Sequence, residues 1–208
     1  TGIDIPGEKG GIMPSKSWKK INRDEPWYRG ETLIAGIGQG FMTSSPLQLA
    51  VATAALANKG QLFQPKLLKG IQASGNSIVE AKNTQSRQIP IKDIHHWEDV
   101  IDGMKMTIYA PKGTARHLNK GLAYTLAGKT GTAQVFGLDA EEQYIAEKYE
   151  EKLRDHALFT GFAPIENPEI AIAVIVENAG SGSSKAAPLG RQVLDVYFDK
   201  QSTNSLTQ

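Results

Sequence analysis

The sequence predicts an α+β fold in which helices pack against an antiparallel sheet. Two strand-like stretches in the C-terminal third, HALFTGFAP and EIAIAVIVEN, are joined by the short Glu166-Asn167-Pro168 turn, which is typical of an antiparallel hairpin. Two helical patterns precede them and are separated by shorter strand signals. With 208 residues, of which 40% are hydrophobic and 22% charged, the chain has the composition of one globular domain.

The first 35 residues are rich in Gly, Pro, Lys and Trp without sustained periodicity, so we expect an irregular, packed lead-in. A helix is then indicated in SSPLQLAVATAALANKG. Ser45 and Gln48 have the spacing of a capping box, Pro46 occupies the first helical position and Gly60 lies past the end. The body of this helix is apolar nearly all round, which predicts burial among other elements.

Residues 61–91 contain two strand-like stretches, FQPKLLKGIQA and NSIVEA, and the intervening Ser74-Gly75-Asn76 predicts a hairpin turn. A second helix follows and is expected to stop before Pro111. Its apolar residues keep helical spacing: Trp97, Val100, Ile101, Met104 and Ile108.

A charged excursion over residues 139–155 follows a strand at GKTGTAQV, and it is predicted to be helical from about 140 to 153. It can be a solvated helix or, because it adjoins that strand, a lid or partner surface; the sequence leaves both open. EIAIAVIVEN is apolar enough to be buried on both faces.

The C-terminal segment predicts a last helix from about Pro188 to Phe198. It is expected to pack through Leu189, Val193 and Tyr197. Residues 1–198 then form the domain, and residues 199–208 form a polar, disordered tail.

Composition excludes several functional classes. A formal net charge of +1 gives no basis for binding nucleic acid. The chain has no cysteine, and its four histidines lack metal-ligand spacing, so neither a metal nor another cofactor is expected. Asp155-His156 could belong to a Ser-His-Asp system, but structural pairing is the better interpretation. The start has neither an initiator Met nor a signal-peptide pattern, so the chain is expected to be a piece of a longer protein.

The stretch LAGKTGTAQV, residues 126–135, is compatible with two enzyme classes. A phosphate-binding loop needs G-x-x-x-x-G-K-[ST] followed by a helix, but the first glycine is replaced by Ala123 and the residues after Lys129 favour a strand. The alternative is the lysine-threonine-glycine element of penicillin-recognising serine acyltransferases. An isolated match of three residues would fit an ordinary sheet edge equally well.

Seven ordered stretches resemble the class B penicillin-binding proteins, and several are most similar to the penicillin-binding protein 2 group of the cell-elongation machinery. The resemblance runs from Thr1 to about Phe198 and identifies the chain as the carboxy-terminal half of a penicillin-binding, β-lactamase-like transpeptidase domain. The stretches are TGIDIPGE, PWYRGET, GIGQGFMTSSPLQLA, GTA at 113–115, AGKTGTAQVFG, LRDHALFTGFAP and AVIVENAG.

The resemblance implies a peptidoglycan D,D-transpeptidase that forms a serine acyl-enzyme. Thr132 is expected to donate its backbone N–H to the oxyanion, and Lys129, Thr130 and Thr132 to bind the substrate carboxylate. Strand alternation places Lys129 on the opposite face from the two threonines, which only a site at the strand edge would resolve. Gly131 is expected to leave room for a substrate backbone, and Gln39 to lie near the cleft in a Gly-Gln-Gly turn.

Two further matches to the family's motifs are interpreted as coincidences. Ser17-Trp18-Lys19-Lys20 fits S-x-x-K, but the charged segment after it is broken by Pro26 and is not the buried helix that a nucleophile requires. Ser74-Gly75-Asn76 fits S-x-N but is explained by turn chemistry. In the resembling proteins both motifs precede TGIDIPGE. The nucleophile is therefore expected upstream of Thr1, and this chain alone is expected to be inactive.

The resemblance also implies partners and a location. The partners are stem peptides ending in D-Ala-D-Ala, β-lactam antibiotics and a glycosyltransferase of the SEDS family. The location is the periplasmic face of the inner membrane, with the anchor outside this chain. A non-catalytic binding module on the same fold remains the alternative.

Overall fold

The computed structural model describes residues 1–72, 78–80, 85–135 and 150–205. At its centre lies a three-stranded antiparallel sheet in the order β5-β6-β7. The strands are β5 (Ala127–Ala133), β6 (His156–Ala163) and β7 (Ile170–Val176). The register pairs Lys129 with Thr160 across β5 and β6, and continues from β6 to β7 as an antiparallel hairpin. The predicted hairpin and the predicted strand at GKTGTAQV are both confirmed.

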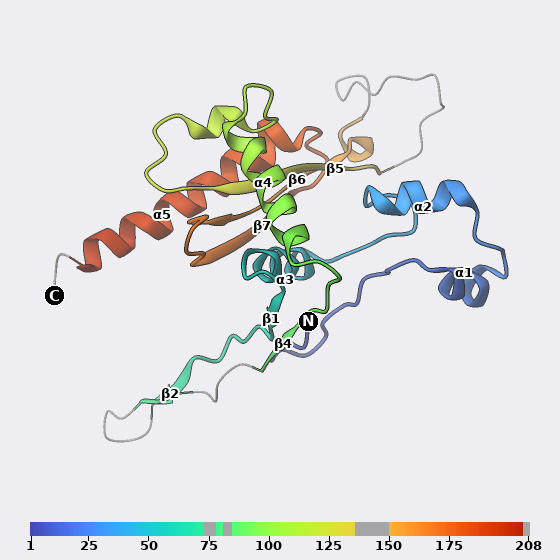
Figure 1. The fold of residues 1–208 in the computed structure, drawn as a ribbon, viewed down its shortest axis with the longest axis horizontal. Helices are drawn as coiled ribbons and strands as arrows, with labels where there is room; N and C mark the ends of the chain where they lie inside the picture. Colours follow the sequence, from blue (N-terminus) through green and yellow to red (C-terminus); the bar gives the residue numbers. More distant parts are fainter. Residues whose placement is uncertain (73–77, 81–84, 136–149, 206–208) are drawn as a thin grey trace.

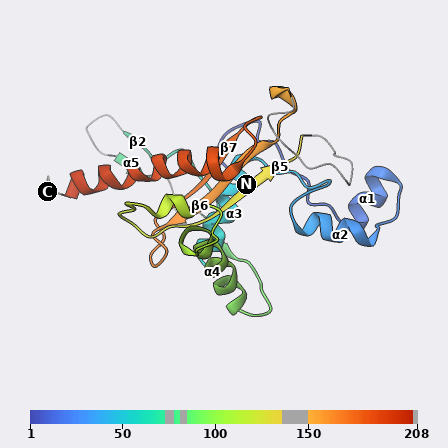
Figure 2. The ribbon, with the colours of Figure 1, turned by 90° about the horizontal axis from the view of Figure 1, so that it is seen from above.

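Helices cover both faces of this sheet (Figures 1 and 2). Helix α5 (Ala187–Ser205) and the π-helical turn η4 (Gly182–Ala186) lie on one face, and α3 (Pro46–Ala57) lies on the other. Helix α4 (His95–Tyr109) packs against β5 and ends before Pro111, as expected. None of the described helices is both long and apolar enough to cross a membrane.

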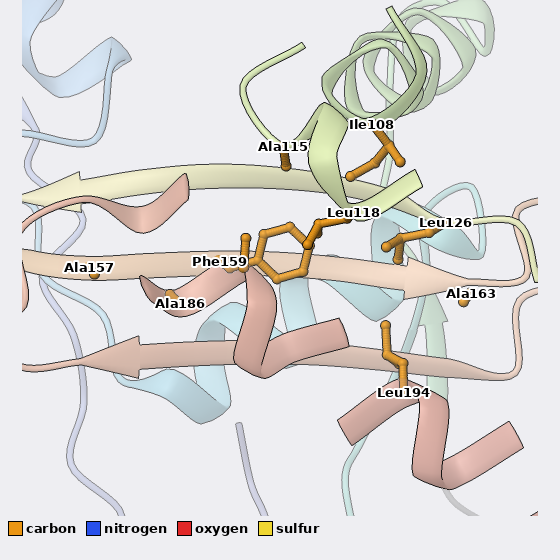
Figure 3. Close-up of a cluster of buried hydrophobic side chains, with 10 residues drawn as sticks. Ile108, Ala115, Leu118, Leu126, Ala157, Phe159, Ala163, Ala186 and Leu194 are labelled. Carbon is orange, nitrogen blue, oxygen red and sulfur yellow. The ribbon is translucent and has the colours of Figure 1, made fainter. Parts of the chain in front are cut away.

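The larger hydrophobic cluster lies between the sheet and α5, with Phe159 of β6 at its centre (Figure 3). A Cβ on Gly190 would lie 2.7 Å from the Phe159 ring, so this glycine allows α5 to approach the sheet closely. The fully or nearly fully buried members are Ile108, Ala115, Leu118, Leu126, Ala157, Phe159, Ala163, Ala186, Ala187 and Leu194. A smaller cluster on the α3 face contains Ala57, Met104, Ala127 and Phe162.

The capping prediction for α3 is confirmed. Ser45 Oγ accepts from the Gln48 N–H at 3.2 Å, and the Ser45 N–H donates to Gln48 Oε1 at 2.9 Å. Pro46 is the first helical residue, and Gly60 has a φ of +92°, a conformation that suits glycine after a helix end. Burial is less complete than predicted, because only Thr53, Ala55 and Ala57 are buried.

The expectation of an irregular lead-in is wrong. Two short helices, α1 (Lys16–Arg23) and α2 (Arg29–Gly36), form an arm beyond the end of β5 (Figures 1 and 2). Ser15 caps α1 by accepting the Trp18 N–H at 3.1 Å. Each helix has only 8 residues, too few for a sustained hydrophobic period, and the contacts of α1 combine the ion pairs of Lys19 with the packing of Trp18 on Phe41.

The packing face predicted for α5 is wrong for Leu189 and Val193, whereas Tyr197 is half-buried. Leu189 is 43% exposed and Val193 54% exposed, whereas Leu194 is fully buried. The helix presents small residues and Leu194 to the sheet, because Gly190 lets the backbone lie against Phe159. It runs to Ser205, past its predicted end at Phe198; residues 206–208 of the predicted tail lie outside the described part.

Strand β7 is half-buried along its whole length rather than buried on both faces. It is one of the two edge strands of this sheet, and within the described residues β6 alone pairs with it.

Two small antiparallel pairs extend away from the sheet (Figure 1). Strand β1 (Gln61–Phe63) pairs with β4 (Ser86–Gln88), and β2 (Gly70–Gln72) pairs with β3 (Ile78–Glu80). The predicted turn at Ser74-Gly75-Asn76 lies outside the described residues. Most of the charged excursion predicted over residues 139–155 also lies outside the described residues. The part from residue 150 onward is described and contains the short 3₁₀ helix η3 (Glu151–Leu153).

Candidate active site

The Lys-Thr-Gly-Thr sequence occupies the middle of β5, from Lys129 to Thr132. The strand continues unbroken from Ala127 to Ala133, so no helix begins after Lys129 and the phosphate-loop interpretation is wrong. Within the described residues, β5 pairs with β6 alone. Its other side is a free sheet edge whose backbone groups can meet a ligand.

Gln39 contacts that free edge. Its Nε2 donates to the Thr132 carbonyl at 3.1 Å, although the two residues lie 93 positions apart. In an antiparallel pair, the N–H and C=O of one residue point to the same side of the strand. The Thr132 N–H therefore faces the Gln39 side, away from β6, where it could donate to a bound oxyanion.

Lys129 reaches the same edge from the opposite face of the sheet. Its side chain lies on the α3 face, opposite Thr160, and its Nζ donates to the Thr130 carbonyl at 2.6 Å. Alternation separates the Lys129 and Thr130 side chains, yet the lysine extends around the edge to the backbone beside Thr132. Lys129, Thr130 and Thr132 therefore all border one pocket at this edge, although their side chains alternate between the two faces of the sheet.

Thr130 points to the α5 face, where it is buried and forms a hydrogen bond with the Thr114 hydroxyl. Its Oγ1 lies 2.8 Å from Thr114 Oγ1, and the Thr114 carbonyl accepts a hydrogen bond from Ser183 Oγ. Sequence reasoning missed Thr114 and Ser183 as site residues. The signal for Thr114 was its place in the quoted GTA stretch; Ser183 had no distinguishing signal.

Two glycines bring the surrounding loops onto the strand. A Cβ on Gly182 would lie 2.3 Å from the carbonyl oxygens of both Gly131 and Leu158, so η4 rests directly on the backbones of β5 and β6. A Cβ on Gly131 would lie 3.3 Å from Leu158 Cβ, which gives this glycine a constraint within the sheet as well. A bound substrate backbone beside β5 would be a second reason for glycine at this position.

These residues surround a pocket of about 640 Å³ at the edge of β5. Among the described residues that line it, Lys129 is the one cation and there is no carboxylate, a balance that suits an anionic ligand. All five predicted site residues meet there. The polar lining residues are Gln39, Thr114, Lys129, Thr130, Thr132, Ser181 and Ser183.

The S-x-x-K match at Ser17 lies elsewhere. Ser17 Oγ is 3.0 Å from Ser15 Oγ, and Lys20 Nζ pairs with Asp24 at 2.6 Å on an exposed part of α1. Neither Ser17 nor Lys20 lines the pocket. The arrangement supports the interpretation of this motif as a coincidence.

Asp155 and His156 have structural partners. His156 Nδ1 accepts the Asn178 N–H at 2.9 Å, and Asp155 accepts the Val135 N–H at 3.4 Å. Burial raises the pKa of Asp155. In the described residues, no group of histidine and acidic side chains has the arrangement of a metal site.

Comparison with known proteins connects this site to one family. Residues 1–195 match the model of the penicillin binding protein transpeptidase domain. The chain is 43% identical over 197 residues to the peptidoglycan D,D-transpeptidase MrdA of Escherichia coli K12. The aligned residues cover 94% of this chain and 30% of that protein. It therefore spans about a third of the length of such relatives.

Solved structures agree in fold. The chain is similar to Pseudomonas aeruginosa PBP2 in complex with WCK 5153, with a TM-score of 0.75 and 43% identity over 93% of this chain and 39% of that one. It is also similar to PBP2 in a complex with MreC from Helicobacter pylori, with a TM-score of 0.75 and 31% identity over 94% of this chain and 32% of that one.

Proposed function

Because this chain belongs to the transpeptidase family of penicillin-binding proteins, we propose that the complete protein is a peptidoglycan D,D-transpeptidase and a target of β-lactams. The observation that carries the proposal is the free edge of β5, where Lys129, Thr130, Thr132 and Gln39 line one pocket. Relatives named as D,D-transpeptidases support it.

The reaction we propose has two steps. A serine hydroxyl supplied by the upstream part of the protein attacks the penultimate D-Ala carbonyl, the peptide C–N bond breaks, and terminal D-Ala leaves with the serine proton. An amine of a second stem peptide then attacks the ester, forms the cross-link and restores the serine hydroxyl. Each attack places negative charge on the carbonyl oxygen, and a preorganised N–H stabilises that charge.

The described residues would orient and stabilise rather than attack. The Thr132 N–H would donate to the oxyanion from the strand edge. The Lys129 ammonium and the Thr130 and Thr132 hydroxyls would bind the terminal carboxylate, since charge-assisted hydrogen bonds are the strongest available to it. Gln39 would hold the Thr132 peptide in place.

We extend three further points to the complete protein as proposals. It would lie at the periplasmic face of the inner membrane, the location that the family resemblance implies. It would act beside a SEDS glycosyltransferase of the elongation machinery. The Helicobacter pylori PBP2 forms a complex with MreC, and an equivalent partner is proposed here.

Labelling of the complete protein with a fluorescent penicillin tests the proposed function. The wild type and Ser17→Ala should both be labelled at one upstream serine, while the 208-residue chain alone should not react. A folded complete protein that takes no label would favour the non-catalytic binding module. Loss of label in Ser17→Ala would overturn the interpretation of Ser17.

A further inference from the structure

Lys19 is a buried charge in an arm whose other residues are exposed or half-buried. Its side chain is 2% exposed, and it is the one buried residue of α1. Its Nζ lies 2.5 Å from Glu31 Oε1 and 3.3 Å from Glu25 Oε2, and 4.4 Å from the centre of the Tyr28 ring. A buried ammonium needs such partners because it has lost its hydration.

Helix α1 contacts the chain both before and after the turn that carries Gln39, which spans residues 37–40. On one side of the turn, Lys19 holds Glu31 in the first turn of α2. On the other side, Phe41 packs against Trp18, with ring centres 5.3 Å apart. Lys19 Nζ itself lies 6.0 Å from the Phe41 ring, so one residue contacts the segments on both sides.

The turn is folded tightly between these two anchors. The Gly38 N–H donates to the Ala35 carbonyl, and the Gln39 N–H donates to the Ile34 carbonyl, both at 3.0 Å. Gly38 and Gly40 have φ values of +75° and +74°, and a Cβ on Gly40 would lie 2.9 Å from Ile34 Cγ2. Because the turn is so constrained, a shift of Glu31 or Phe41 should also move the Gln39 side chain.

We propose that Lys19 is a positioning residue for the active site: it holds α1 against both sides of the Ile37–Phe41 segment and so places Gln39 Nε2 on the Thr132 carbonyl. The inference rests on the proposed function, because it assigns a role in penicillin acylation. It predicts that Lys19 acts on the β5 edge through Gln39, although Lys19 does not line the pocket.

A double-mutant cycle in the complete protein tests this role. The variants are Lys19→Met, Gln39→Ala and the double variant, and Lys20→Met is the matched control. Lys20 is the adjacent lysine; its side chain is 68% exposed and forms an ion pair with the exposed Asp24. The measurement is the second-order rate constant of acylation by a fluorescent penicillin, with circular dichroism to confirm folding.

Gln39→Ala should slow acylation about fivefold, the effect of one neutral hydrogen bond. Lys19→Met should slow it by a similar factor, and the double variant should be no slower than either, because both changes remove the same contact. Lys20→Met should match the wild type. A role limited to stability would instead give effects that multiply, or no effect of Lys19→Met on the rate, and either result overturns the proposal.

If Lys19→Met fails to fold, Glu31→Gln decides the question, since it keeps the side-chain shape and a hydrogen-bond acceptor. Glu31→Gln should slow acylation less than Lys19→Met does, and it should cause no further loss when Gln39 is already alanine. If the effects of Glu31→Gln and Gln39→Ala on the rate constant multiply, the proposal is refuted. Failure of the proposed function is distinguishable, because the wild type itself would then take no label.

Discussion

The Gln39 side chain and the Thr132 carbonyl, 93 residues apart, meet at 3.1 Å on the free edge of β5. This bond shows that the Thr132 carbonyl, and with it the Thr132 N–H, points away from β6. It also means that an arm built from the first part of the chain completes the wall of a pocket built on the sheet. The site is thus a product of two segments that no local sequence pattern connects.

The charge of the pocket predicts the effect of a carboxylate at position 39. Gln39→Glu keeps the side-chain size but removes the donor and adds a negative charge to a lining whose described cation is Lys129. An anionic substrate should then be repelled, so penicillin acylation should fall further than the roughly fivefold loss expected for Gln39→Ala. Equal rates for the two variants would contradict an anion-binding pocket.

The close contact at Gly182 predicts a strong effect of a single methyl group. Gly182→Ala would place a Cβ 2.3 Å from two backbone carbonyl oxygens, so η4 must shift and carry Ser183 away from Thr114. We expect a lower melting temperature and slower acylation. Gly103→Ala is the control: it is exposed in α4 with nothing within 4 Å, and it should stabilise the helix by about 0.5–1 kcal/mol. Wild-type behaviour of Gly182→Ala would show that η4 does not rest on the strands.

The packing face of α5 can be tested by two leucines. Leu194 is fully buried, so Leu194→Ala should lower the free energy of unfolding by about 2–5 kcal/mol. Leu189 is 43% exposed, and Leu189→Ala should cost much less. Urea denaturation of the complete protein measures both. The reverse order would restore the face that the sequence predicted.

The Lys19–Glu31 contact predicts a pH dependence. The pKa of Glu31 is lowered, first by the hydrogen bond from Lys19 and next by the Tyr28 N–H. The unfolded chain therefore binds the proton more tightly, so the contribution of this carboxylate to stability is complete above its ordinary pKa of 4.5 and is lost as the pH falls through the lower folded value.

Glu31→Gln should remove that part of the acid sensitivity. The difference in free energy of unfolding between the wild type and Glu31→Gln should be largest at neutral pH and should shrink below pH 4.5. Urea titrations at several pH values measure it. A difference that stays constant with pH would show that the charge of Glu31 does not stabilise the arm.

Local chemistry predicted much of the fold. The capping box at Ser45 and the stop at Pro111 set the bounds of α3 and α4, because caps and breakers act through neighbouring residues. The final hairpin followed from two apolar stretches joined by a short turn, and the strand at GKTGTAQV from residues that favour a strand. The lysine-threonine-glycine element pointed to the strand that lines the pocket.

The errors concern features that depend on distant contacts. Helix α1 contacts distant residues, Glu31 through Lys19 and Phe41 through Trp18, and local patterning does not reveal such contacts. The α5 face was misassigned because Gly190, Ala187 and Leu194 meet the sheet, and the close approach at Gly190 leaves no hydrophobic signal in the sequence. Ser183 joins the site through a bond to a carbonyl 69 residues away. Only the tertiary structure brings such groups together.

The most direct test of β5 as the active-site strand is the second-order rate constant of penicillin acylation of the complete, folded protein. Lys129→Ala should lower it about ten- to a hundredfold, since one charge-assisted bond contributes about 1.5–3 kcal/mol. Thr132→Ala should cost less because it keeps the backbone N–H, and Thr132→Pro should cost most because it removes that N–H and disturbs the strand. Near wild-type rates for Lys129→Ala and Thr132→Ala together would contradict the assignment and leave β5 an ordinary sheet edge.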